Sequence, residues 1–175
     1  MITANNITYR FKGLVGSFEL GPISVEIPSG KPVFWIGHIG SGKSTLARIL
    51  CGELTPDAGR IEGLNGTSIY HHQSVVDNIF PDLSVGEHLR LLGRDGRSRD
   101  VLADRVLSEI HDISNKYPDE LSGGQLQLVA FATITLETHS LYVFDEVFNN
   151  LDHSHAAQVM NSIRRILAEN ANAHC

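Results

Sequence analysis

Residues 37–45 read G-H-I-G-S-G-K-S-T and follow a short apolar run, V-F-W-I-G at 33–37. Glycine has no Cβ, so a glycine-rich backbone can approach an anion closely and surround it with successive N–H groups. The stretch matches the pattern G-x-x-x-x-G-K-[ST] in full, between an expected buried parallel strand and an expected helix. It therefore predicts a phosphate-binding loop (P-loop) in an α/β fold.

Each residue of this loop is a candidate ligand of a nucleoside phosphate. We expect Lys43 to reach the β- and γ-phosphates and the Ser44 hydroxyl to bind Mg²⁺. The other candidates for contact with the phosphates are Gly37, His38, Ile39, Gly40, Ser41, Gly42 and Thr45. A glycine-rich turn with an exposed lysine is the alternative interpretation, but the full match and its context favour phosphate binding.

A second strand-like run, L-Y-V-F at 141–144, ends in the carboxylates Asp145 and Glu146. Because side chains alternate along a strand, the two carboxylates leave the sheet edge in different directions. We expect Asp145 to hold Mg²⁺, directly or through water. Glu146 is then left to orient and deprotonate a water molecule aimed at the γ-phosphate. A surface acidic pair that ends a strand is the alternative.

The stretch L-S-G-G-Q at 121–125 predicts a helix start. Ser122 is a good N-cap residue, and glycine costs roughly 1 kcal/mol inside a helix, so Gly123 and Gly124 are expected at its beginning. Unpaired backbone N–H groups at a helix N-terminus attract anions. An ordinary capped helix start is the alternative interpretation. A chain that binds one triphosphate needs one cradle, so a second cradle would agree with contact to the nucleotide of a partner molecule.

The composition sets limits on the class of protein. The chain has 175 residues, 42% of them hydrophobic and 19% charged, with a net charge of −6. The acidic balance argues against nucleic acid as a partner, because binding to phosphate backbones depends on lysine and arginine. Cys51 and Cys175 make no disulfide framework, which favours a reducing compartment. No apolar run approaches the roughly 18 residues that a membrane-spanning helix needs.

The pattern along the chain predicts three parts. Residues 1–30 alternate short apolar stretches with glycine and proline, which is typical of antiparallel strands. Residues 31–73 and 119–175 carry the P-loop core, and residues 74–118 are an inserted helical subdomain with a charged joint at 93–100. Further expected elements are helices at 46–50, 83–92, 101–113, 123–138 and 153–169 and strands at 68–70 and 141–144.

The motifs together resemble the nucleotide-binding domain of an ATP-binding cassette (ABC) ATPase. The P-loop, Gln73, L-S-G-G-Q, Y-V-F-D-E at 142–146 and N-N-L-D at 149–152 occur in the family's order and span most of the chain. L-S-G-G-Q, the family signature, is the most specific. The resemblance implies a P-loop NTPase (RecA-like) core with an N-terminal antiparallel β subdomain and an inserted α-helical subdomain. It also implies ATP and Mg²⁺ as cofactors.

The resemblance implies further roles for single residues. Gln73 corresponds to the Q-loop glutamine, which contacts Mg²⁺ and the attacking water. Phe11 is our choice for the aromatic ring that stacks on adenine, with Tyr9 as the alternative. In a head-to-tail dimer, the signature residues of one domain cover the γ-phosphate held by the other, and the D-loop aspartate faces the partner. Those positions are Ser122, Gly123, Gly124, Gln125 and Asp152.

The function implied is that of the ATP-hydrolysing subunit of an ABC transporter. It would pair with a second ABC ATPase domain, identical or paralogous, and serve a separate integral-membrane subunit from the cytoplasmic face of the membrane. A soluble ABC ATPase that acts on DNA or ribosomes is an alternative, disfavoured by the acidic balance and the short stretch between Gln73 and Ser122. An ATP-gated dimerisation module with weak or no hydrolysis is another.

Three departures from the family pattern bear on this choice. Val147 stands where proline is usual, and the helix after the signature lacks the usual arginines. The family also has a switch histidine on a strand after the last helix. His174 lies 28 residues after Glu146 with no strand-like run before it. We therefore expect that the chain ends before that strand, or that the ATPase works without the histidine.

Overall fold

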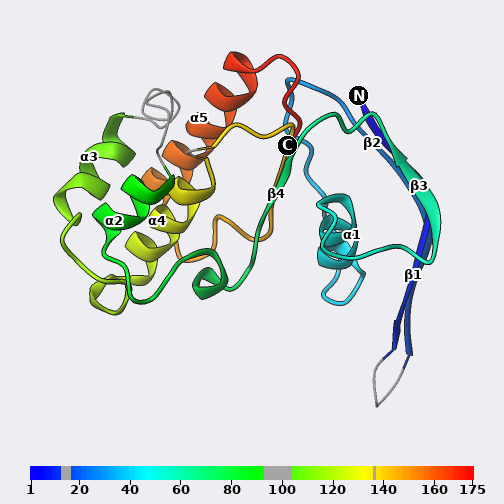
Figure 1. The fold of residues 1–175 in the computed structure, drawn as a ribbon, viewed down its shortest axis with the longest axis horizontal. Coiled ribbons are helices and arrows are strands. Elements are labelled where there is room, and N and C mark those ends of the chain that lie inside the picture. Colours follow the sequence, from blue (N-terminus) through cyan, green and yellow to red (C-terminus); the bar gives the residue numbers. More distant parts are fainter. Residues whose placement is uncertain (13–16, 93–103, 136) are drawn as a thin grey trace. The chain divides into compact units, whose positions relative to one another are not determined.

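The computed structural model describes residues 1–12, 17–92, 104–135 and 137–175, and Figure 1 shows their fold. Two compact units are present. The first contains Met1–Tyr70, His139–Val143 and Ala171–Cys175, and the second contains His71–Thr138 and Phe144–Asn170. Each unit is thus assembled from segments that are distant in sequence. The three-part organisation expected from the sequence remains a prediction.

The first unit is built on an antiparallel sheet. Strand β1 (Ile2–Lys12) lies between β2 (Ser17–Ile27) and β3 (Ala58–Glu62) and is antiparallel to both. The expected antiparallel strands in residues 1–30 are confirmed. Strand β3 was missed, because its sequence A-G-R-I-E has little of the apolar alternation that predicts a strand.

Helix α1 (Lys43–Leu50) completes the core of this unit. Its apolar face carries Leu46, Ile49 and Leu50, all buried, which follow the spacing of an amphipathic helix. They share one apolar cluster with inward-facing strand residues, namely Ile2, Ala4, Ile7, Leu20, Ile27 and Leu141. The P-loop, which leads into α1, is therefore joined to a packed element.

The prediction of a buried strand at 33–37 is wrong. These residues are assigned to no strand, and the side chains of Phe34 and Ile36 are 61% and 97% exposed. A buried parallel strand needs hydrogen-bonded neighbours along its length. Val33 N donates to the carbonyl of Cys175 at 2.8 Å, but residues 33–37 belong to neither sheet of the described residues.

Residues 173–175 also depart from expectation. Strand β4 (Ser68–His71) pairs with β5 (Leu141–Phe144), and His174 forms a parallel bridge with Leu141. Tyr142 N donates to His174 O, and His174 N donates to Ser140 O, both at 2.9 Å. His174 is therefore buried in strand-like pairing, which the preceding sequence N-A-N-A did not predict.

The second unit is helical. It contains the short 3-10 helices η1 (Val75–Asn78) and η2 (Pro118–Glu120) and four α-helices, which are α2 (Val85–Leu92), α3 (Asp104–Asp112), α4 (Gly123–Thr135) and α5 (His153–Glu169). The four α-helices correspond to the four helices expected after residue 80. The joint expected at 93–100 and the start of the helix expected at 101–113 lie outside the described residues.

Helix α4 is the centre of this unit and packs against η1, α2, α3 and α5 (Figure 1). Every residue from Gln127 to Thr135 is buried. A helix that is apolar on all sides belongs inside a protein rather than on its surface. Helix α4 contains no arginine, and an arginine within its buried part would need a partner for its charge.

Across the described ranges, no helix combines the length and apolar character required to cross a bilayer.

We predict that Phe131→Ala strongly destabilises the protein. Phe131 is fully buried in α4, and its ring centroid lies 5.5 Å from that of Phe144. Truncating a buried phenylalanine costs about 3–5 kcal/mol of unfolding free energy. Urea unfolding measures this loss. Phe34→Ala is the matched control, since Phe34 is 61% exposed and surface changes cost about 0.5 kcal/mol. Equal losses would contradict the central position of α4.

Candidate functional site

The P-loop turns into α1 at Gly42. Gly42 is the residue before the helix and has a φ of 91°, and Gly40 has a φ of 79°. Both angles lie in the left-handed region, which residues with a Cβ rarely adopt. Ser41 N donates to His38 O at 3.2 Å and closes a turn inside the loop. Glycine at these positions is therefore required by the path of the chain.

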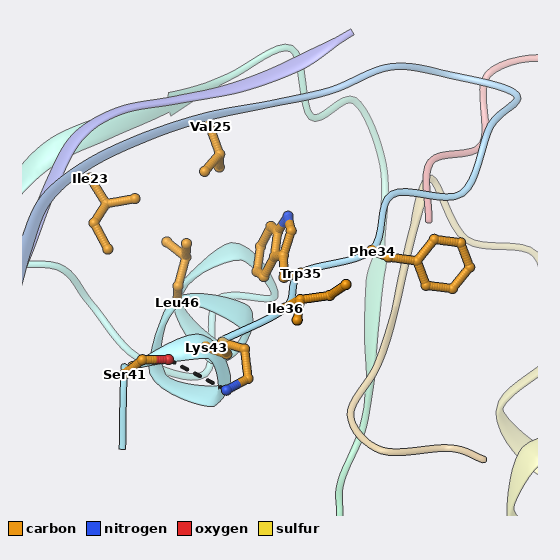
Figure 2. Close-up of a pocket in the computed structure, with 9 residues that line it drawn as sticks. Ile23, Val25, Phe34, Trp35, Ile36, Ser41, Lys43 and Leu46 are labelled. Carbon is orange, nitrogen blue, oxygen red and sulfur yellow. Dashed lines mark hydrogen bonds between the residues drawn. The ribbon is translucent and has the colours of Figure 1, made fainter. Parts of the chain in front are cut away.

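Lys43 folds back over this loop. Its Nζ lies 2.9 Å from the carbonyl oxygens of both Gly37 and His38 and 3.4 Å from Ser41 Oγ (Figure 2). Because an ammonium group only donates, the three oxygens together hold one positive charge at the loop. The predicted ligands 37–45 thus form one local structure, with Ser44 exposed and Thr45 half-buried.

An apolar cavity of about 350 Å³ lies beside Lys43. Ile23 and Val25 of β2 face Trp35 and Leu46 across it (Figure 2). Phe11, the predicted adenine-stacking residue, is not among its lining residues. The Phe11 side chain is 53% exposed and meets Tyr9 edge to face, with ring centroids 6.4 Å apart. Its role in stacking remains a prediction.

The second unit holds the other predicted catalytic residues. Gln73 Nε2 donates to Glu146 Oε2 at 2.8 Å, and Asn149 Nδ2 donates to the same oxygen at 2.5 Å. Glu146 has a φ of 53°, and Asn149 N donates to Glu146 O at 2.9 Å. The chain therefore makes a tight turn after β5, and two amide groups hold the Glu146 carboxylate within it.

The ends of β4 and β5 are aligned by a backbone bond. Asp145 N donates to His71 O at 3.1 Å, which brings Gln73 and Glu146 to the same edge. The His71 side chain is fully buried, 6.2 Å from the ring of Phe144. Burial lowers the pKa of His71 to about 4, so the ring is neutral near pH 7. The His71 ring thus packs in an apolar setting. The described residues contain no cluster of three metal-ligating side chains.

Helix α4 supports the turn that carries Glu146. The buried Gln127 Nε2 donates to the carbonyl of Val147 at 3.0 Å. A Cβ built at Gly124 would lie only 3.3 Å from Asn150 O, and one at Gly123 would lie 3.9 Å from Asn150 Cβ. The two glycines therefore let the start of α4 approach the D-loop closely, and Gly124 is the more restricted of the pair.

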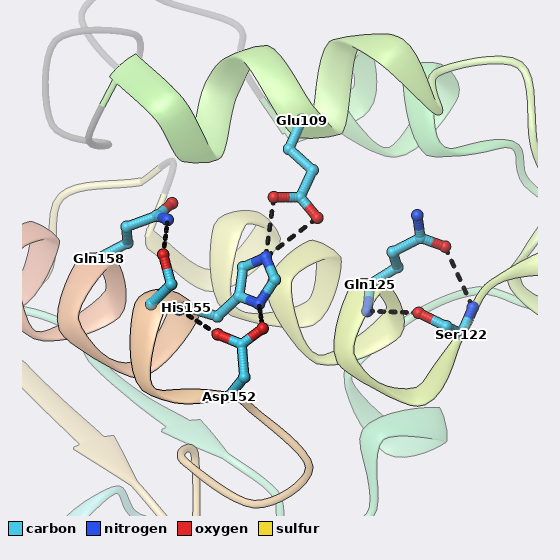
Figure 3. A network of polar contacts seen from close by, with 7 residues as sticks. Glu109, Ser122, Gln125, Asp152, His155 and Gln158 are labelled. Carbon is cyan, nitrogen blue, oxygen red and sulfur yellow. Dashed lines mark hydrogen bonds and ion pairs between the residues drawn. The ribbon is translucent and has the colours of Figure 1, made fainter.

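The start of α4 is capped as the sequence predicts. Gln125 N donates to Ser122 Oγ at 3.3 Å, and Ser122 N donates to Gln125 Oε1 at 3.1 Å (Figure 3). This reciprocal pair is a capping box, which satisfies two N–H groups near the helix start. The predicted position of the glycines is confirmed, because α4 begins at Gly123. Ser122 and Gly123 are exposed, so this helix start is open to a ligand.

Asp152 caps the next helix, α5. Its Oδ1 accepts a hydrogen bond from His155 N at 2.9 Å. That bond, together with the nearby His155 ring, lowers the pKa of Asp152 below its ordinary value. Asp152 also remains 64% exposed. Its predicted contact with a partner domain is thus compatible with its position.

The geometry and the family comparison agree. Residues 20–149 match the family model described as ABC transporter. This match covers well over half of the chain, and the protein belongs to the ABC family as an ATP-binding, ATPase-type nucleotide-binding domain.

Similar proteins give the same assignment. The energy-coupling factor transporter ATP-binding protein EcfA1 of Enterococcus faecalis is 32% identical, with 97% of this chain and 67% of the relative covered. The cell division ATP-binding protein FtsE of Mycobacterium tuberculosis is 29% identical, with 95% and 80% covered. A dimeric ATP-binding cassette bound to ADP and phosphate has a TM-score of 0.79 at 23% identity, with 99% and 85% covered. At that identity the structural likeness shows the fold.

Sequence reasoning missed Asn149, Gln127 and His155. Asn149 was quoted within N-N-L-D without a role, although an amide three residues after a turn-forming glutamate is well placed to bond back to it. Gln127 carried no signal, because a single glutamine inside an apolar helix has no characteristic spacing. His155 likewise had no signal, because its partner Glu109 lies 46 residues away.

We predict that Asn149→Ala lowers the maximal rate of ATP hydrolysis by about tenfold to a hundredfold, because a hydrogen bond to a charged group contributes about 1.5–3 kcal/mol. The Glu146 carboxylate would then lose the hydrogen bond from Asn149 and retain the one from Gln73. Steady-state phosphate release measures the rate. Asn161→Ala, an exposed asparagine on α5, is the control and should keep the parent rate. An Asn149→Ala protein as fast as the parent would show that this amide does not position Glu146.

Proposed function

We propose that this chain is the ATP-binding and ATP-hydrolysing subunit of an ABC transporter, which dimerises head to tail around two ATP molecules. The observation that carries the proposal is the exposed, capped start of α4. Ser122, Gly123, Gly124 and Gln125 form a second anion-attracting helix N-terminus in addition to the P-loop. In a two-fold symmetric dimer each such helix start would face the partner's nucleotide, giving two composite sites.

Each residue would have a role that its own local surroundings support. Lys43 supplies positive charge at the P-loop, where phosphate oxygens would replace the carbonyls it now contacts. Glu146, oriented by Gln73 and Asn149, would hold the attacking water and accept its proton. Asp152, exposed at the start of α5, would face the partner across the interface.

The residues expected to hold Mg²⁺ have suitable chemistry. Ser44 offers a hydroxyl oxygen, Gln73 an amide oxygen and Asp145 a carboxylate oxygen, and Mg²⁺ prefers oxygen ligands. When bound, the ion would neutralise charge on the transferred phosphate. Phe11 would stack on the adenine ring with its exposed face.

The transport role is supported by the relatives. EcfA1 is by name an ATP-binding protein of a transporter, and a membrane pathway for this chain would lie on a separate integral-membrane subunit. The chain would then act at the cytoplasmic face of the membrane. Relatives at similar identity serve different processes, since FtsE is named for cell division.

A second candidate function is an ATP-gated dimerisation module with weak or no hydrolysis. The observation that favours it is the position of His174. This residue is 5% exposed, and its Nδ1 lies 3.1 Å from Ser140 O, so its ring is not presented to a phosphate as a switch histidine would be. Binding of ATP and pairing through the signature would survive such a loss, whereas turnover would fall.

We predict that Glu146→Gln abolishes turnover but lets an ATP-bound dimer accumulate, because the base is lost while the binding groups remain. Phosphate release and light scattering after size exclusion measure the two effects. Hydrolysis by the parent favours the first candidate, and pairing without hydrolysis in either form favours the second.

Ser122→Arg tests the dimer itself. In the Glu146→Gln background it should prevent ATP-driven pairing, since a bulky cation would occupy the helix start, while nucleotide binding by the monomer persists. Ser29→Arg, an exposed serine in a turn of the first unit, is the control and should pair normally. Normal pairing by Ser122→Arg would exclude the signature from the interface and overturn the proposal.

A further inference from the structure

His155 lies between two carboxylates, one on α3 and one just before α5 (Figure 3). Its Nε2 is 2.9 Å and 3.1 Å from the two carboxylate oxygens of Glu109 on α3. Its Nδ1 is 3.0 Å from Oδ2 of Asp152, which precedes α5. The His155 backbone N–H also donates to Asp152 Oδ1. One ring therefore connects the D-loop carboxylate to the helical segment.

The geometry specifies the charge of this ring. An ionised carboxylate can only accept hydrogen bonds, so both ring nitrogens must donate for both contacts to exist. Only the imidazolium form has two N–H groups. The bond to Glu109, and then the charges of Glu109 and Asp152, raise the pKa of His155 above its ordinary value, despite an opposing effect of burial.

Helix α4 brings no charge to the ring. Helix α4 packs against both α3 and α5, and Gly123–Thr135 contains no charged residue. Glu109 and Asp152 are the charged groups that raise the pKa of His155. The side chains of His155 and Glu109 are 24% and 29% exposed, so this contact is better shielded from solvent than an ordinary surface pair.

We propose that His155 is a positioning residue whose charged form fastens Asp152 to α3, so that ATP-driven pairing of two domains is strengthened at lower pH. This inference rests on the proposed role of Asp152 at the dimer interface. A fastened Asp152 is already ordered before the partner arrives, so pairing costs less conformational freedom. When His155 loses its second proton, one of its two carboxylate contacts is lost and Asp152 is released from α3.

The direction of the pH effect follows from the pKa shifts. The raised pKa of His155 means that its contribution is fully present below about pH 6.5 and is lost as the pH rises through the folded-state pKa. The lowered pKa of Asp152 keeps that carboxylate ionised throughout this window. The pH dependence therefore belongs to the histidine.

Nitrogen-15 NMR of the histidine rings tests the charge directly and does not depend on dimerisation. His155 should show two protonated ring nitrogens at pH 6 and a titration midpoint above the usual value, and Glu109→Gln should lower that midpoint. His153→Gln assigns the neighbouring signal, since His153 is exposed on the same helix turn. A His155 ring that is neutral at pH 6, or a midpoint unmoved by Glu109→Gln, would overturn the inference.

Pairing is then measured by analytical ultracentrifugation with ATP in the Glu146→Gln background between pH 6 and 9. His155→Gln should weaken pairing by about threefold to tenfold at pH 6 and leave it unchanged at pH 9, because a partly shielded ion pair is lost only where the ring is charged. Glu109→Gln should act likewise, and His153→Gln should follow the parent. Equal profiles for the parent and His155→Gln would overturn the inference alone. Absence of ATP-driven pairing in the parent at every pH would overturn the proposed function as well.

Discussion

The burial of α4 is the constraint on which the second unit depends. From Gln127 onward no face of this helix meets water, so its neighbours must supply apolar contact on every side. The same burial places the Gln127 amide against the Val147 carbonyl and fixes the turn that carries Glu146. It also leaves the glycine end of the helix at the surface. The signature at the start of α4 and the turn that carries Glu146 are therefore held by the same packing of one helix.

Features that depend on local chemistry were predictable from the sequence. The P-loop requires glycine where φ is positive, at Gly40 and Gly42, and a lysine just after them. The sequence motif contains both. Ser122 and Gln125 have the residue types and the spacing of a capping box. Helix α5 was expected at the residues where it is found. Family membership followed from the order of these motifs, each of which is specified over a few neighbouring residues.

Features that depend on distant partners were not predictable. The apolar run at 33–37 has the composition of a buried strand, yet pairing decides the outcome, and Phe34 is exposed. Strand β3 exists because β1 offers it an edge. Asn149 and His155 acquire roles only when the turn and α3 bring carboxylates to them. Local sequence spacing does not predict such contacts, because the partners of His155 and Glu146 lie up to 73 residues away.

The division of the chain into interleaved segments has a consequence for synthesis. The first unit consists of Met1–Tyr70, His139–Val143 and Ala171–Cys175, so the chain passes between the units four times. Leu141 belongs to the apolar cluster of this unit, and Ala173 accepts a bond from Gly30 N. On the ribosome, domains usually fold in order from the N-terminus as they emerge. This unit cannot complete its folding until residues 171–175 have been synthesised. Neither unit exists as a continuous stretch of polypeptide, so neither is expected to fold when excised from the other.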